Sequence, residues 1–169
     1  MGELDNAKKA LKDAIAELQV IKNNEHLAIA YTKLASIAFF EKKYDIAYTN
    51  YKAAYDILLK GNSLNVVVIA AEFTELLNKI GKYDEALTVI ESAKNSPFFK
   101  NVNTEDKLRF DVAAAETYKN TDKHEEALTG LTGAIKMQDT MSRINNNDYV
   151  NVLQASLQKE LQQEKALVL

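Results

Sequence analysis

The sequence predicts an all-α protein built from repeated helical hairpins, and three observations support this prediction. Good helix formers dominate a chain that has only 5 Gly and 1 Pro, which is too few for a protein of strands and tight turns. Apolar residues recur at helical spacing along most of its length. A short pattern of small and large side chains also returns about every 40 positions, as it does in helical repeat proteins.

The composition argues against several classes of function. Of the 169 residues, 47% are hydrophobic and 27% are charged, as in ordinary globular proteins. A net charge of -3 provides no basic surface for nucleic acid. The longest apolar run, Val66 to Ala71, is far shorter than the about 20 residues that span a bilayer, so no membrane insertion is expected. Without Cys there is no disulfide, thiolate nucleophile or cysteine-based metal site.

The repeated pattern places two alanines around one large residue. Residues at i, i+4 and i+7 share one helix face, where two small side chains allow a neighbouring helix to approach and the large one fills the space between them. The three full copies are Ala47, Tyr51 and Ala54, then Ala86, Ile90 and Ala93, then Ala127, Leu131 and Ala134, and a fourth copy near the start is Ala7, Leu11 and Ala14. The pattern therefore predicts four equivalent helices.

A partner helix precedes each of the three later copies. The predicted partner helices are Glu25 to Glu41, Leu64 to Ile80 and Thr104 to Asn120, and the links to the following helices are Glu41-Lys42-Lys43, Gly81-Lys82 and Thr121-Asp122-Lys123. Links this short join antiparallel neighbours. We therefore expect a helical half-repeat followed by three hairpins.

These residues resemble the tetratricopeptide repeat (TPR) family, whose unit reads W-x2-L-G-x2-Y, then A-x3-F, then P. The second helices match this pattern, whereas Tyr31, Ala70 and Asp111 replace the Trp. The resemblance implies a TPR-like solenoid of antiparallel hairpins over residues 1–147, with about three full repeats and the N-terminal half-repeat. Residues 148–169 would form a C-terminal capping helix of the same domain.

The chain also resembles the TPR region of bacterial sensor and signalling proteins, including membrane-anchored histidine kinases. It would lie in the periplasm if it is an excised sensor region, and otherwise in the cytoplasm. In the TPR family, ligands lie in a concave groove lined by the first helices. The groove residues that this implies are Thr32, Ser36, Phe39, Phe40, Ala71, Glu75, Asn78, Lys79, Val112, Glu116, Lys119 and Asn120. The Lys and Asn of the family's carboxylate clamp are replaced by Thr32 and Ser36.

No motif in the sequence points to catalysis. His26 has no carboxylate at a metal-ligand spacing, and His124 occupies the position that is Tyr in the two preceding repeats, which favours a packing role. Glu125-Glu126 has the character of a solvated helix surface. The chain has no Gly-rich phosphate loop or nucleophile elbow. We therefore expect no enzyme activity and no cofactor, and the favoured function is a non-catalytic scaffold that binds a protein or peptide.

The alternative function is a homo-oligomerisation element of a multiprotein complex. In that case the C-terminal helix or an edge of the repeat array would form a homodimer. The apolar stripe of the C-terminal helix, which is expected to cap the last hairpin, consists of Tyr149, Leu153, Leu157 and Leu161. A separate question concerns Phe98-Phe99, which follow Pro97 in the longest predicted link. They would either cover the hydrophobic edge between two repeats or form an exposed anchor for a partner, and the first is favoured because two exposed Phe side chains would promote aggregation.

Overall fold

A computed structural model describes residues 2–140, 153–159 and 163, and within these residues all regular structure is helical. The all-α prediction is confirmed. The elements are α1 (Gly2–Val20), α2 (Asn24–Phe40), α3 (Tyr44–Lys60), α4 (Val66–Lys79), α5 (Tyr83–Lys94), the short 3₁₀ helix η1 (Phe99–Asn101), α6 (Thr104–Lys119) and α7 (His124–Thr140). The predicted partner helices correspond closely to α2, α4 and α6.

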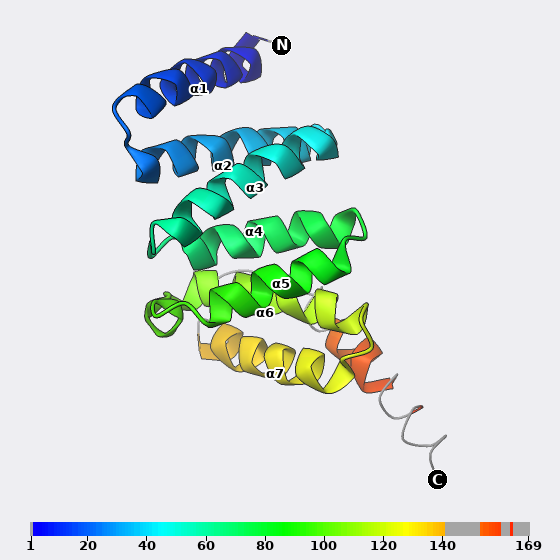
Figure 1. The fold of residues 1–169 in the computed structure, drawn as a ribbon. Helices are drawn as coiled ribbons and strands as arrows, with labels where there is room; N and C mark the ends of the chain where they lie inside the picture. Colours follow the sequence, from blue (N-terminus) through cyan, green and yellow to red (C-terminus); the bar gives the residue numbers. More distant parts are fainter. Residues whose placement is uncertain (1, 141–152, 160–162, 164–169) are drawn as a thin grey trace.

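Helices that follow one another in the sequence lie next to one another in space. Figure 1 shows α1 to α7 stacked in chain order, with the α2–α3, α4–α5 and α6–α7 turns together on the right-hand side. Each helix packs against the next one, and α4 also packs against α6. This is a helical-repeat-like, all-α architecture.

The residues of the repeated pattern form much of the core. Ala47, Ala86 and Ala127 are completely buried, and the large residues between the alanines are at most 3% exposed. The copy in α1 is different, because α1 has no buried residue and its main neighbour is α2. The side chains of the repeated pattern are therefore buried in α3, α5 and α7 but only partly buried in α1.

The short turns depend on residues in the left-handed conformation. Lys42, Gly81 and Asp122 have φ values of 59°, 74° and 56°, and each lies just beyond the end of a helix. In the first two of these turns, the N–H of Lys43 donates to the carbonyl of Ala38 at 2.8 Å, and that of Lys82 to the carbonyl of Leu77 at 2.9 Å. This is the Schellman arrangement, which satisfies carbonyls at a helix end while reversing the chain.

The link between α5 and α6 contains the predicted Phe pair. Phe99 packs edge-on against Phe110, with ring centroids 5.3 Å apart, and Phe110 is completely buried. Phe98 is half-buried. Phe99 therefore covers the core at the junction of the two helices, as the sequence analysis expected.

The predicted C-terminal helix is described only in part. Leu153 and Leu157 are 8% and 1% exposed, and the Lys119 ammonium on α6 donates to Ser156 at 3.1 Å, so residues 153–159 pack against the body of the protein. Tyr149, Leu161 and the predicted boundary at residues 147–148 lie outside the described residues. Among the helices that are described, none is long and apolar enough to cross a membrane.

Candidate functional site

Polar side chains from α2, α4 and α6 meet in one continuous network, which we call the α2–α4–α6 face. At its centre is Glu72 of α4, which accepts a hydrogen bond from Ser36 of α2 at 3.4 Å. The other Glu72 oxygen lies 3.6 Å from the guanidinium of Arg109 on α6. One carboxylate thus connects the first helices of all three hairpins, the same helices on which the resemblance placed a groove.

Tyr51 of α3 contacts two members of this network. Its hydroxyl lies 3.1 Å from Ser36 and donates to Glu72 at 3.2 Å, and the residue is only 3% exposed. Burial raises the pKa of the Tyr51 hydroxyl, and the neighbouring carboxylates of Glu72 and Glu75 raise it further, whereas the Ser36 contact lowers it. The hydroxyl therefore stays protonated and able to donate over the physiological pH range.

The surroundings of Glu75 on this face affect the charge of its carboxyl. It is half-buried, and burial raises the pKa of its carboxyl. Arg109 opposes this effect, while Glu72 and Glu116 add to it. Three carboxylates thus share the nearby positive charge of Arg109. A cationic side chain of a ligand would reduce their mutual repulsion.

Asn78 and Thr32, two of the predicted groove residues, are buried and form hydrogen bonds within the fold. Asn78 is 6% exposed and its amide donates to the Ala113 carbonyl at 2.9 Å, while its oxygen accepts from Thr117 at 2.7 Å. It therefore bridges α4 and α6. Thr32 is 8% exposed and its hydroxyl donates to the Ala28 carbonyl of its own helix.

Most of the other predicted groove residues present more of their surface to solvent. Phe40, at the end of α2, is 82% exposed, and Lys79 and Asn120 are also exposed. Half-buried positions are occupied by Ser36, Phe39, Val112, Glu116 and Lys119, while Ala71 is buried. Phe39 packs against Tyr44, with ring centroids 5.9 Å apart, so of the two Phe residues only Phe40 is largely free to contact a ligand.

Glu72 and Arg109, which are central to the network, are not among the residues predicted from the sequence. The signal that could have identified them is helical spacing, since Glu72 lies three residues before Glu75, and Arg109 lies three before Val112 and seven before Glu116. Residues at these spacings share one helix face. The family pattern led instead to positions nearer the C-terminal ends of the helices.

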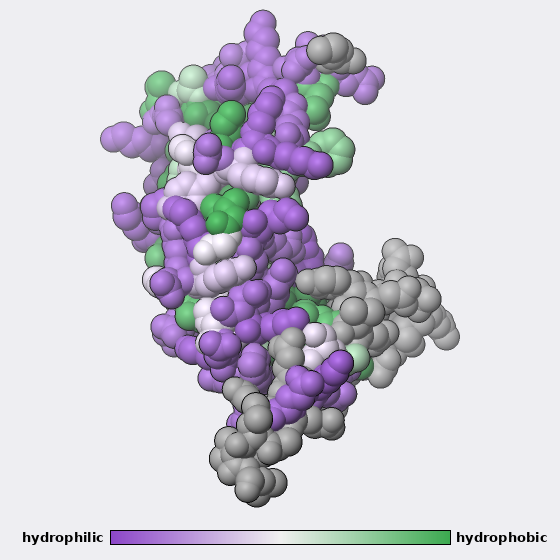
Figure 2. All heavy atoms as spheres, turned by 90° about the vertical axis from the view of Figure 1, so that its right-hand side faces the viewer, coloured by the Kyte–Doolittle hydropathy of each residue, from purple (hydrophilic) through white to green (hydrophobic). Residues whose placement is uncertain are grey.

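The groups that the face presents are polar, charged and aromatic side chains. In the part of the chain that the structure describes, no group of three or more His, Cys, Asp or Glu side chains is placed to hold a metal ion. What the face offers is a mixed-charge centre, hydroxyl groups and one exposed aromatic ring. Figure 2, which looks onto the helix ends at the three turns, shows a mainly hydrophilic surface with separate hydrophobic patches.

Comparison of the chain with models of known protein families, and with curated proteins, finds no match.

Proposed function

We propose that the protein is a non-catalytic scaffold of TPR-like hairpins that binds a segment of another protein on the α2–α4–α6 face. The observation that carries this proposal is the network centred on Glu72, which joins Ser36, Tyr51 and Arg109. Side chains held by several partners form a surface that loses little entropy when a ligand binds. The repeated small–large–small pattern supports the TPR-like arrangement, because it is a rule for packing helix on helix.

The ligand that fits this face is a segment with a basic residue and an apolar residue. The basic residue would lie at Glu75 and Glu116, where burial already makes the ionised Glu75 unfavourable. The apolar residue would cover the Phe40 ring, of which 82% is in contact with solvent. Removing exposed apolar surface from water stabilises such a complex by about 25 cal/mol per Å².

Selection from a displayed library of random peptides tests this proposal. Peptides enriched on the unmodified protein are synthesised, and their affinities for it and for Phe40→Ala and Glu75→Lys are measured by fluorescence anisotropy. We expect each substitution to weaken binding of peptides specific for the face by roughly tenfold or more. We also expect a basic residue in the enriched peptides.

Matched controls come from helices outside the face. Leu59 on α3 is 42% exposed and Glu91 on α5 is exposed, so Leu59→Ala and Glu91→Lys repeat the two chemical changes elsewhere. The proposal would be wrong if every enriched peptide bound Phe40→Ala and Glu75→Lys as tightly as these controls.

A further inference from the structure

A concave region lies between α1, α2 and α3. This α1–α2–α3 cleft has a volume of about 660 Å³, and side chains of Ile15, Leu34 and Ile46 contribute its apolar lining. The volume lies in the range of roughly 300–1,000 Å³ that is typical of ligand sites. Leu34 is half-buried and Ile46 is 53% exposed, so apolar surface is open to a ligand.

The neighbouring hairpin shows what fills the corresponding position. In the repeated pattern Leu34 corresponds to Phe73, because each lies 13 residues before the first alanine of the next helix, Ala47 or Ala86. Phe73 is 1% exposed, and its ring centroid lies 5.8 Å from that of Tyr48 and 6.0 Å from that of Tyr55. Aromatic rings of the chain itself therefore occupy the space between α3, α4 and α5.

The charges around Tyr48 have counterparts at the cleft as well. The Lys82 ammonium lies 3.9 Å from the centroid of the Tyr48 ring, a cation–π contact. In the repeated pattern Lys82 corresponds to Lys43, which lines the cleft. A ring that entered the cleft would thus have a lysine at the corresponding place.

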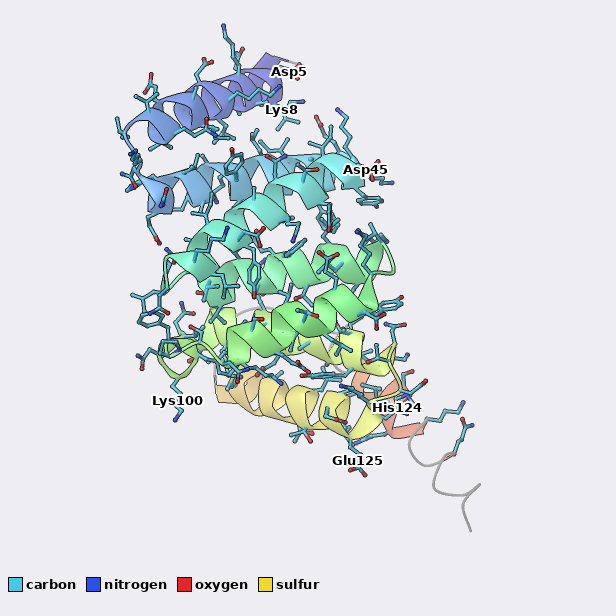
Figure 3. The ribbon with its side chains drawn as sticks, viewed as in Figure 1. Asp5, Lys8, Asp45, Lys100, His124 and Glu125 are labelled. Atoms are coloured by element: carbon cyan, nitrogen blue, oxygen red, sulfur yellow. The ribbon has the colours of Figure 1, made fainter. Side chains whose placement is uncertain are left out.

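The rim of the cleft carries more positive than negative charge. It has the four lysines Lys8, Lys9, Lys12 and Lys43 and the two carboxylates Asp5 and Glu41. Lys8 pairs with Asp5 at 3.0 Å and with Glu41 at 2.7 Å, and Lys43 pairs with Glu41 at 2.8 Å. Lys9 and Lys12 form no ion pair with any of the described residues. Figure 3 shows Asp5 and Lys8 at the end of α1 near the end of α3 that carries Asp45.

From the cleft, its unfilled apolar lining and its unpaired lysines, we propose that the α1–α2–α3 cleft is a second binding site, which takes an aromatic side chain of a partner protein flanked by Asp or Glu. The aromatic ring fills the space that Phe73 and Tyr48 fill in the next hairpin. The flanking carboxylates pair with Lys9 and Lys12. This site is separate from the α2–α4–α6 face and takes a ligand of the opposite charge.

A second copy of this chain is a poorer occupant. Among the described residues Phe40 is the one large aromatic side chain that is mostly exposed. Glu41 follows it, but this carboxylate is already paired with Lys8 and Lys43 of its own chain. The next residues are Lys42 and Lys43, so docking Phe40 of a second copy would bring lysines towards the lysines of the rim. Like charges brought together in an interface disfavour the complex.

The same displayed library tests the cleft, using two substitutions that act in different ways. Leu34→Phe places a ring of the protein in the cleft, and Lys12→Glu reverses an exposed charge at its rim without touching the core. We expect a class of enriched peptides with an aromatic residue next to Asp or Glu. Leu34→Phe and Lys12→Glu should each weaken their binding by roughly tenfold or more, and added salt should weaken it further.

The controls separate this site from the α2–α4–α6 face and from self-association. Phe40→Ala and Glu75→Lys should leave binding of these peptides unchanged, as should Lys60→Glu, which reverses an exposed charge on α3 away from the cleft. The proposal is overturned if peptides of this class do not emerge, or if those that do bind Lys12→Glu as tightly as the unmodified protein. It is also overturned if light scattering shows a dimer that Leu34→Phe dissociates, because the occupant would then be a second copy.

Discussion

The region between α1, α2 and α3 and the region between α3, α4 and α5 share the same repeated pattern, but different side chains fill them. Between α3, α4 and α5, Phe73 is enclosed by the rings of Tyr48, Tyr51 and Tyr55, with centroids about 6 Å away. Between α1, α2 and α3, Leu34 holds the corresponding position and a cleft of about 660 Å³ remains. The architecture is the same, and the difference lies in which side chains occupy it.

The polar contacts at the edges of the two regions differ as well. The Tyr48 hydroxyl donates to Glu85 at 2.8 Å, so the filled region has a satisfied polar edge. The corresponding residues at the cleft are Lys8 and Ile46, which cannot form that bond. A position that serves stability in one repeat is thereby left open in another, and this open position is the basis of the binding that we propose for the cleft.

The largest effect that this comparison predicts is on stability. Phe73→Ala should lower the free energy of unfolding by about 3–5 kcal/mol, because it removes a fully enclosed ring. Leu34→Ala should cost only about 1–2 kcal/mol, because Leu34 already borders open space. Urea unfolding followed by circular dichroism measures both values. Equal losses would show that the two regions are packed equally tightly.

The turns that close the two hairpins provide a second, smaller test. Gly81 closes α4–α5 with φ 74° and Lys42 closes α2–α3 with φ 59°, a conformation that costs a residue with a Cβ atom about 1–2 kcal/mol. Gly81→Ala should therefore destabilise the protein by about 1 kcal/mol, and Lys42→Gly should stabilise it by up to about 1 kcal/mol.

Thermal unfolding of these variants and of Gly133→Ala measures the effect and includes an internal control. Gly133 lies inside α7, and a Cβ atom there would meet nothing within 4 Å. The same Gly→Ala change should stabilise the protein by roughly 0.5–1 kcal/mol at that position. Effects of the same sign at Gly81 and Gly133 would contradict the conformational explanation.

Sequence reasoning predicted the fold better than the site. Periodicity identified α2, α4 and α6 and the buried alanines, because both depend on local spacing along one helix. It could not show that Leu11 in α1 is less enclosed than Tyr51 in α3, since burial depends on which helices lie beside a face. The left-handed conformation of Lys42 and Asp122 could not be predicted either, because of these three turn residues only Gly81 is a glycine, the residue type that adopts it most readily.

The same limit applies to the candidate site. Helical spacing places Glu72 and Glu75 on one face of α4, but it does not show that Arg109 reaches Glu72 from another helix. Nor could the pattern show that Asn78 is enclosed between α4 and α6. Contacts between helices depend on their packing, and a motif defined within one helix contains no information about them.

Filling the cleft is a third way to sharpen the comparison between the two regions. Leu34→Phe should make the first region resemble the second and raise the free energy of unfolding by about 0.5–1 kcal/mol, as cavity-filling substitutions commonly do. Chemical denaturation measures this gain. Val112→Phe on α6, which adds a ring outside the cleft, is the control and should give no comparable gain. Destabilisation by Leu34→Phe would show that the cleft cannot take a ring without strain.

The smallest predicted effect concerns the charge of Glu75 on the α2–α4–α6 face. Burial raises the pKa of Glu75 above its ordinary value of 4.5, so the folded protein binds this proton more tightly than the unfolded chain does. The stabilising contribution of the protonated carboxyl is complete below the unfolded pKa and is lost as the pH rises through the folded pKa.

Glu75→Gln should therefore gain stability relative to the unmodified protein as the pH rises from about 4 towards 7, because Gln stays neutral. Chemical denaturation at a series of pH values measures this difference, with Glu91→Gln on α5 as an exposed control that should show no such trend. A difference that stays constant across the series would mean that Glu75 ionises as readily in the folded protein as in the unfolded chain. The case for a cationic ligand group at Glu75 would then lose its electrostatic support, while the contacts proposed for the α1–α2–α3 cleft would be unaffected.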